Sequence, residues 1–274
     1  MTRLSIRLFF ALAAGLYAAA ATAHEFWLLP DRFAAPVGAT VRLRMFVGEQ
    51  FAGDQVGFST TLVSGAHHYT SGGDSDLGAA VPAAPIGDLP LALRTPGTHL
   101  VAIDSYPSQI ELEAGRFHAY LHDEGLDDIV KAREKAGTAA TPGRERYRRN
   151  VKTLVTAGTP GAPGDQVFSR ITGQRMEIVP QSDPQLLATG QDLRVQVLFD
   201  GKPLATALVK FWHRRGAQSL LVRTVTDQNG MAVFTPPWPG TWMASVVHMI
   251  PATDSREVDW DSYWANLTFA LPRR

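Results

Sequence analysis

The 274-residue chain contains no cysteine. This absence excludes disulfide bonds, a thiolate nucleophile and zinc–thiolate sites. The fold must therefore be held by ordinary hydrophobic cores, and any bound metal ion must use nitrogen and oxygen ligands. The chain also lacks a net charge, because 26 lysines and arginines balance 26 aspartates and glutamates. The charge therefore gives no indication of nucleic acid or an anionic membrane as a partner.

Several enzyme signatures are missing as well. The sequence has no Gly-x-Ser-x-Gly elbow, no glycine-rich phosphate loop and no His-Glu-x-x-His metalloprotease motif. His24 and Glu25 begin the last of these motifs but are followed by Phe26 and Trp27, which do not complete it. These absences favour a binding protein over an enzyme.

The start of the chain has the composition of a secretory signal peptide. Arg3 and Arg7 make its first segment positive, and residues 8–20 form an uncharged apolar run. Ala21-Thr22-Ala23 then provides a small-x-small cleavage site. The apolar run is too short to span a bilayer comfortably. We therefore expect a periplasmic protein that begins at His24 and has no membrane anchor.

Beyond the signal, short runs alternate polar and apolar residues or are rich in β-branched residues, with Gly, Pro and Asp between them. This pattern predicts short strands joined by tight turns. The predicted strands include 40–46, 99–103, 193–199, 207–211, 220–226, 231–234, 241–248 and 265–270.

Two segments interrupt this β pattern. Residues 123–136 predict a helix, because acidic residues gather at the start, basic residues at the end, and Gly137 follows as a stop. Residues 144–154 give a weaker prediction of a second helix. Both predicted helices precede a stretch rich in Gly, Pro and Ala at 156–166, which has the composition of a linker or long surface loop.

We therefore predict a mainly β fold of two β-sandwich-like domains. Residues 1–23 form the signal peptide, and 24–175 form an N-terminal β-rich domain with a short helical insertion. Residues 176–274 form a C-terminal immunoglobulin-like sandwich, because antiparallel strand and turn signals follow one another there at short spacing.

The expected mature N-terminus has the chemistry of a metal ligand. His24 would carry both a free α-amine and an imidazole, which together can chelate one ion; a second histidine would make a histidine brace. An α-amine loses its proton near pH 8, so binding near neutral pH costs little. Such nitrogen donors suit nickel, copper or zinc. The alternative is that His24 is only the first residue of a β domain.

The other histidines differ in their suitability as a second ligand. His67-His68 are adjacent, so on a strand they would point to opposite faces. His118 and His122 have the i,i+4 spacing of one helix face. His248 ends a predicted strand and leads into the loop 254–264, which is rich in acidic and tryptophan residues. A histidine at such a strand end is a plausible edge of a site, although a core histidine with one hydrogen bond is the plainer interpretation.

An ordered series of motifs over nearly the whole mature chain resembles one known family. The motifs are His24-Glu-Phe-Trp-Leu28, Phe117-x-x-Tyr-Leu-x-x-Glu-Gly-Leu126, Arg144-Glu-Arg-Tyr-x-Arg-x-x-Lys-x-Leu154, Gly201-Lys-Pro-Leu204 with Ala207-x-Val-Lys-Phe211, and Pro239-Gly-Thr-Trp-Met243 through His248-Met249 and Trp260-x-Ser-Tyr-Trp264 to Leu267-Thr-Phe269. Together they resemble a periplasmic domain-of-unknown-function family that is associated with nickel uptake. The resemblance implies a ligand role for His24 and His248 and a separate metal permease in the inner membrane as partner.

We therefore expect a periplasmic transition-metal-binding protein, an accessory to nickel or cobalt uptake, whose metal ligands are His24 and His248. A carboxylate or water would complete the site. One alternative is a copper-dependent oxidase or oxygenase that uses the same histidine brace. Another is a structural or interaction sandwich without a metal.

Overall fold

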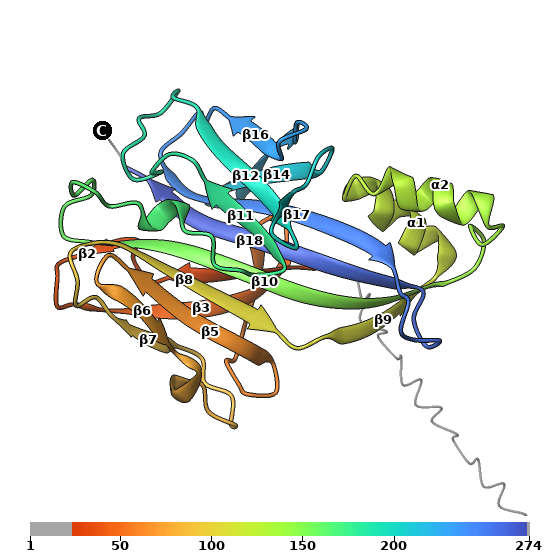
Figure 1. Cartoon of the computed structure of the whole chain (residues 1–274), viewed down its shortest axis with the longest axis horizontal. Helices are drawn as coiled ribbons and strands as arrows, with labels where there is room; N and C mark the ends of the chain where they lie inside the picture. Colours follow the sequence, from red (N-terminus) through yellow and green to blue (C-terminus); the bar gives the residue numbers. More distant parts are fainter. Residues whose placement is uncertain (1–23, 273–274) are drawn as a thin grey trace, which may run out of the picture.

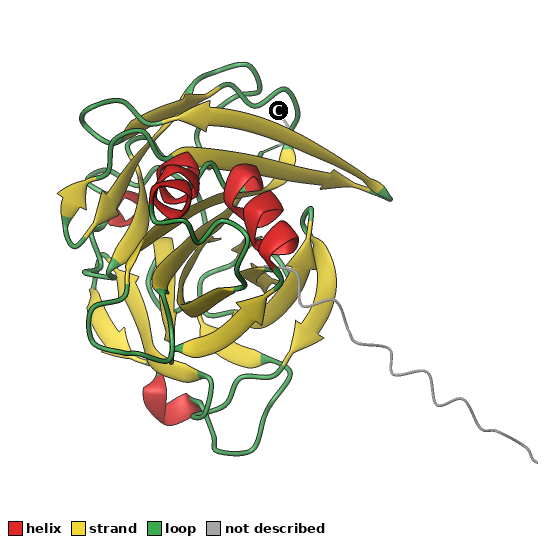
Figure 2. Ribbon diagram, turned by 90° about the vertical axis from the view of Figure 1, so that its right-hand side faces the viewer, coloured by secondary structure: helices red, strands yellow, loops and turns green. Residues whose placement is uncertain are grey.

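The computed structural model describes residues 24–272, so the predicted signal peptide lies outside the described residues. Within this range the chain is mainly β, with two α-helices and two single 3-10 turns (Figures 1 and 2). None of the described helices has the length and apolar character needed to cross a membrane. In chain order the elements are β1 (Glu25–Pro30), β2 (Ala34–Ala35), β3 (Thr40–Glu49), β4 (Ala52–Val56), β5 (Val63–Thr70), β6 (Gly73–Asp76), η1 (Gly78–Ala80), β7 (Leu89–Ala92), β8 (Gly97–Ser105), β9 (Ser108–Leu112), α1 (Ala114–Asp123), α2 (Asp127–Lys135), β10 (Gly143–Ala157), η2 (Val167–Ser169), β11 (Met176–Pro180), β12 (Leu193–Phe199), β13 (Lys202–Pro203), β14 (Leu208–Arg215), β15 (Gln218–Val225), β16 (Met231–Phe234), β17 (Gly240–Pro251) and β18 (Trp260–Leu271).

A ten-stranded sheet runs through the whole molecule (Figure 1). Its main path is β15-β14-β17-β18-β10-β8-β5-β6, and β2 and β9 also pair with β10. At its centre β10 and β18 run parallel, in register from Glu145 opposite Trp260 to Thr153 opposite Thr268. Strands from both sides of the expected domain boundary at 175/176 therefore share one sheet.

Two smaller sheets cover the opposite faces of this long sheet. The first contains β1, β3, β4 and β7, and the second contains β11, β12, β13 and β16. Alternation along β17 separates the two cores, because successive side chains of a strand point to opposite faces. Met243 packs against Trp27 of the first sheet, whereas Trp242 and Ala244 join the core under the second. The prediction of a mainly β fold with two sandwich-like units and a helical insertion in the first is confirmed.

The helical insertion differs in detail from its prediction. The segment predicted at 123–136 contains α2, but α1 precedes it and the two are separated at Gly125, whose φ of 70° favours glycine. On α1, the buried side chains Phe117, Tyr120 and Leu121 follow helical spacing and pack into the core beside β17 and β18.

The helix predicted at 144–154 is wrong, since these residues lie in β10. The reason is tertiary pairing. Arg144 forms an ion pair of 2.6 Å with Asp259, which lies just before β18. Arg146 forms an ion pair of 2.6 Å with Asp261 of β18. Cross-strand partners of this kind decide the conformation of a segment whose local composition also suits a helix.

A buried ion pair ties the long sheet to the second small sheet. Lys152 Nζ on β10 lies 2.5 Å from Glu177 Oε2 on β11, and both side chains are at most 2% exposed. Glu177 also accepts hydrogen bonds from Thr172 and from the backbone N–H of Gly173. Burial lowers the pKa of Lys152, and the nearby Glu177 carboxylate opposes this shift.

We predict that Lys152→Met destabilises the protein by about 3 kcal/mol or more, because it leaves the Glu177 carboxylate buried without its cation. Urea unfolding monitored by tryptophan fluorescence measures the change. Arg170→Met is the matched control, since Arg170 and Asp74 form an exposed ion pair whose loss should change stability by less than about 1 kcal/mol. Equal, small losses in both variants would contradict the prediction.

Candidate functional site

His24 lies immediately before β1, at the edge of the first small sheet. In the β1–β3 ladder Glu25 lies opposite Gly48, which brings His24 next to Glu49 at the end of β3. His24 Nε2 is 3.9 Å from Glu49 Oε1, and the two side chains are 37% and 53% exposed. The predicted ligand therefore lies at the surface, beside a carboxylate contributed by the neighbouring strand.

His248 lies on the other face of the long sheet. Its ring is half-buried against Phe199, with 4.6 Å between ring centroids. Burial lowers the pKa of His248, while the charge of Asp200 opposes the shift. Ser245, three residues earlier on the same strand, points to the opposite face and donates a hydrogen bond to Glu25 of β1. The structure therefore does not bring His24 and His248 together, because the long sheet lies between their side chains.

The remaining predicted candidates do not converge either. His118 and His122 do share a face of α1, with ring centroids 4.6 Å apart, and His122 Nδ1 lies 2.9 Å from Asp127 at the surface. His67 and His68 point to opposite faces of β5, as expected, but His68 is buried and lies 2.7 Å from His99. Among residues 24–272, no group of three or more His, Asp or Glu side chains has an arrangement that could hold a metal ion.

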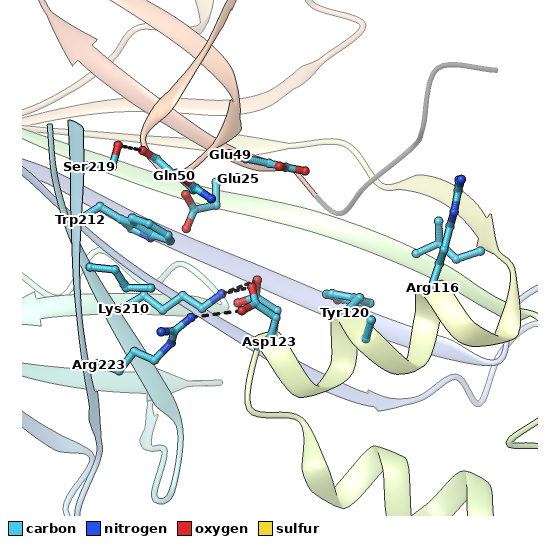
Figure 3. Close-up of a pocket in the computed structure, with 14 residues that line it drawn as sticks. Glu25, Glu49, Gln50, Arg116, Tyr120, Asp123, Lys210, Trp212, Ser219 and Arg223 are labelled. Carbon is cyan, nitrogen blue, oxygen red and sulfur yellow. Dashed lines mark hydrogen bonds and ion pairs between the residues drawn. The ribbon is translucent and has the colours of Figure 1, made fainter. Parts of the chain in front are cut away.

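A cavity of about 680 Å³ lies beside the N-terminal edge (Figure 3). It is bounded by elements that are far apart in sequence: β1, the turn after β3, the end of β9, α1, β14 and β15. Its lining residues are Glu25, Glu49, Gln50, Leu112, Arg116, Ala119, Tyr120, Asp123, Glu124, Lys210, Trp212, Ser219, Leu221 and Arg223. Its size is that of a typical small-molecule site.

Glu25 is the buried carboxylate of this cavity, and its side chain is only 5% exposed. Its Oε1 accepts a hydrogen bond of 2.8 Å from Ser245 Oγ. Its Oε2 is buried and has no hydrogen-bond partner among the described residues. Burial, with the nearby charge of Glu124, raises the pKa of Glu25 to about 7, although Ser245 and Lys210 act in the opposite direction.

The other charged groups of the inner cavity neutralise one another. Lys210, 2% exposed, donates hydrogen bonds of 2.8 Å to both Asp123 and Glu124 at the end of α1. Arg223 reaches Asp123 at 3.2 Å. Burial alone would lower the pKa of Lys210, but the two carboxylates raise it overall. Burial raises the pKa of Glu124, while Lys210 opposes that shift.

Aromatic side chains form the apolar wall of the cavity. Trp212 packs in a small cluster with Trp27 and Met243, and Tyr120 stacks on Trp264 with ring centroids 5.7 Å apart. The Tyr120 hydroxyl donates to Glu145 at 3.1 Å. These contacts fix both rings, so the wall is formed before any ligand enters.

The sequence contains weak signals for Glu25 and Lys210, two charged residues of this cavity. An acidic residue immediately before the apolar run Phe26-Trp-Leu-Leu29 is unusual for a buried strand, and its position next to His24 marks the same edge. Lys210 likewise interrupts an apolar strand between Val209 and Phe211. Nothing in the sequence indicates that these two groups meet.

We predict that Glu25 makes the folded state less stable as pH rises from 4.5 to 7. Because its pKa is raised from 4.5 to about 7, the carboxyl group of Glu25 binds its proton more tightly in the folded protein than in the unfolded chain. This difference stabilises the folded state at low pH, and the stabilisation is lost as the pH rises and the proton dissociates. Between pH 4.5 and pH 8, the free energy of unfolding of Glu25→Gln should therefore rise by up to about 3 kcal/mol relative to that of the wild type.

Urea unfolding at the two pH values measures this difference. Glu134→Gln, on the exposed side of α2, is the control and should show the same offset from wild type at both pH values. A parallel pH dependence of the wild type and Glu25→Gln would show that Glu25 does not titrate in this range.

Comparison with solved structures finds only weak similarity. A tetra-tandem repeat from the extending region of a large adhesion protein is 11% identical, with 92% of this chain and 50% of that chain covered and a TM-score of 0.22. The D00–D0 domain of intimin is 11% identical, covering 91% of this chain and 100% of that chain with a TM-score of 0.18. Three N-terminal domains of the Highly Immunogenic Outer Capsid protein of bacteriophage RB49 are 12% identical, covering 90% and 59% with a TM-score of 0.19. This chain spans half the length of the first of these, and likeness at this level carries no functional argument.

The family comparison is more informative. No curated protein matches the sequence. Residues 21–250 match the model of a family described as "Domain of unknown function (DUF4198)". The match spans the predicted cleavage site, both α-helices, strands β1 to β16 and all but the last residue of β17, and so includes His24, Glu25 and His248. The chain therefore belongs to the domain-of-unknown-function family DUF4198.

Proposed function

We propose that the protein is a periplasmic transition-metal-binding protein, an accessory to nickel or cobalt uptake, whose ion is held at the mature N-terminus. The observation that carries the proposal is the position of Glu49 on the Nε2 side of His24. Histidines that ligate a metal commonly donate their other ring N–H to a carboxylate, which orients the ring and increases its basicity. At 3.9 Å, Glu49 is within ion-pair distance of Nε2, and in the proposed complex it moves closer to accept this hydrogen bond. Nδ1 and the α-amine of His24 then close the chelate.

The exposure of this edge supports a carrier function. His24 and Glu49 are 37% and 53% exposed, so an ion held there remains accessible to a second protein. A permease that receives the ion needs such an open position, whereas a permanent structural ion is normally enclosed by protein ligands. Water or a carboxylate would occupy the remaining coordination positions. The assignment of nickel or cobalt as cargo rests on the family resemblance, since nitrogen sites bind copper more tightly in vitro.

This proposal changes the ligand set expected from the sequence. His248 lies against Phe199 on the other face of the long sheet, so it does not belong to the proposed site. His24 remains, and Glu49 takes the supporting role.

We predict that nickel binding requires the free amine of His24. Mature protein that begins at His24 should bind Ni²⁺ at least a hundredfold more tightly than a form with one extra alanine before His24, because the extension removes the amine from the chelate. Isothermal titration calorimetry of both forms, with the N-terminus verified by mass spectrometry, measures the difference. Equal affinity of the two forms would overturn the proposed chelate.

We also predict that Glu49→Gln weakens Ni²⁺ binding about tenfold, because loss of an outer carboxylate typically reduces metal affinity by 10- to 100-fold. The matched comparison is His248→Gln, which should bind Ni²⁺ as wild type does. A loss of affinity in His248→Gln, with Glu49→Gln unaffected, would restore the ligand set expected from the sequence. Consumption of oxygen by the copper-loaded protein in the presence of a reductant would instead favour the oxidase alternative.

A further inference from the structure

The cavity beside β1 contains one charge that the protein itself does not neutralise. Lys210 is paired with Asp123 and Glu124, and Arg223 is paired with Asp123. Glu25 has no ion-pair partner among the described residues, and its buried Oε2 has no donor within hydrogen-bond distance there. The indole N–H of Trp212, which also lacks a partner among these residues, lies near enough to lower the pKa of Glu25. Figure 3 shows its carboxylate turned towards Trp212 and Lys210, into the cavity. A buried carboxylate oxygen without a donor is rare in folded proteins and indicates a missing partner.

We propose that this cavity binds a small organic cation, a primary ammonium with an apolar or aromatic body, and that Glu25 is its counter-ion. An ammonium group supplies the donor that Oε2 lacks and the positive charge that Glu25 lacks. Many ligands could supply either a hydrogen-bond donor or a positive charge, but a cationic hydrogen-bond donor supplies both.

The charge balance of the cavity favours a cation over an anion. Lys210 and Arg223 offset the charges of Asp123 and Glu124, so an ionised Glu25 leaves one net negative charge among these five groups. Lys210 and Glu124 are buried, whereas Asp123 and Arg223 are more than half exposed. At the rim, Glu49 and Arg116 are both exposed and have opposite signs. An anionic ligand would therefore be repelled by the ionised carboxylate of Glu25, and no unpaired cation of the lining would offset this repulsion.

The walls of the cavity suit the apolar part of such a ligand. Trp212 and Tyr120 present aromatic rings, and Leu112 and Leu221 complete the apolar lining. Aromatic faces attract a nearby ammonium through cation–π interactions. A volume of about 680 Å³ admits an aromatic amine with room for ordered water.

This inference is independent of the proposed metal site. His24 and Glu25 are adjacent, and the Glu25 side chain enters the cavity to reach Ser245, whereas His24 contacts Glu49 at the surface. The two proposals can therefore fail separately.

The experiment is calorimetric titration of the mature protein with 2-phenylethylamine at pH 8, in buffer containing a metal chelator. We expect saturable binding of the amine, because its ammonium group can donate to Glu25 Oε2 inside the cavity. 3-Phenylpropionate has a similar body with the opposite charge and should not bind. Absence of amine binding, or binding of 3-phenylpropionate in its place, would overturn the proposal.

Variants locate the site. Glu25→Gln keeps a hydrogen-bonding group for Ser245 but removes the charge, so it should weaken amine binding at least tenfold. Glu134→Gln should bind as wild type does. Ala119→Trp places a bulky ring at the exposed side of the cavity on α1 and should also block binding, with an unchanged melting temperature. Retention of amine binding in Glu25→Gln or in Ala119→Trp would overturn the proposal.

The form with one alanine before His24 separates this proposal from the metal site. It should lose Ni²⁺ binding and keep amine binding. If it loses amine binding, the ammonium is not held by Glu25 in the way proposed.

Discussion

The parallel pairing of β10 with β18 is the interaction on which the other layers depend. It joins the first half of the chain to its last strand, and Thr153 and Thr268 add a buried hydrogen bond of 2.8 Å between their hydroxyl groups. With this pair in place, the long sheet offers two faces, and each small sheet buries its apolar side on one of them. A parallel pair is normally found where both faces are covered, and here both are.

The candidate site exists because two apolar clusters on one face of the long sheet do not merge. One lies under β1 and β3 and contains Phe26 and Leu28; the other lies under α1 and contains Phe117 and Tyr120. Between them the sheet presents Lys210, Ser245 and other polar residues in place of aliphatic ones. Polar groups in such a gap need partners, and most of them find one across the cavity. Among the described lining residues, Oε2 of Glu25 and the indole N–H of Trp212 do not, and these two atoms give the cavity its chemical character.

The strands were predictable from the sequence because their signals are local. Alternation of residues identifies 193–199 and 241–248, and the turn formed by Asp227-Gln-Asn-Gly230 marks where the chain passes from β15 in the long sheet to β16 in the second small sheet. The strand β10 was not predictable, since its charges suit a helix until Asp259 and Asp261 from 115 residues further along the chain pair with them. The same limit applies to the site. His24 stands out by its place after the cleavage motif, but the partner of Glu25 lies 220 residues away, and no local pattern records that contact.

These long separations have a kinetic consequence. The contact between Glu25 and Ser245 spans 220 residues, and the one between Thr153 and Thr268 spans 115. Closing loops of this length precedes any gain from the contacts, so folding is slow and non-local. Because the chain is synthesised from its N-terminus, its central sheet cannot be completed until the final strand, β18, is available. During that interval the edges of β10 and β17 expose unpaired backbone groups, and the growing chain depends on protection from aggregation until β18 fills the gap between them.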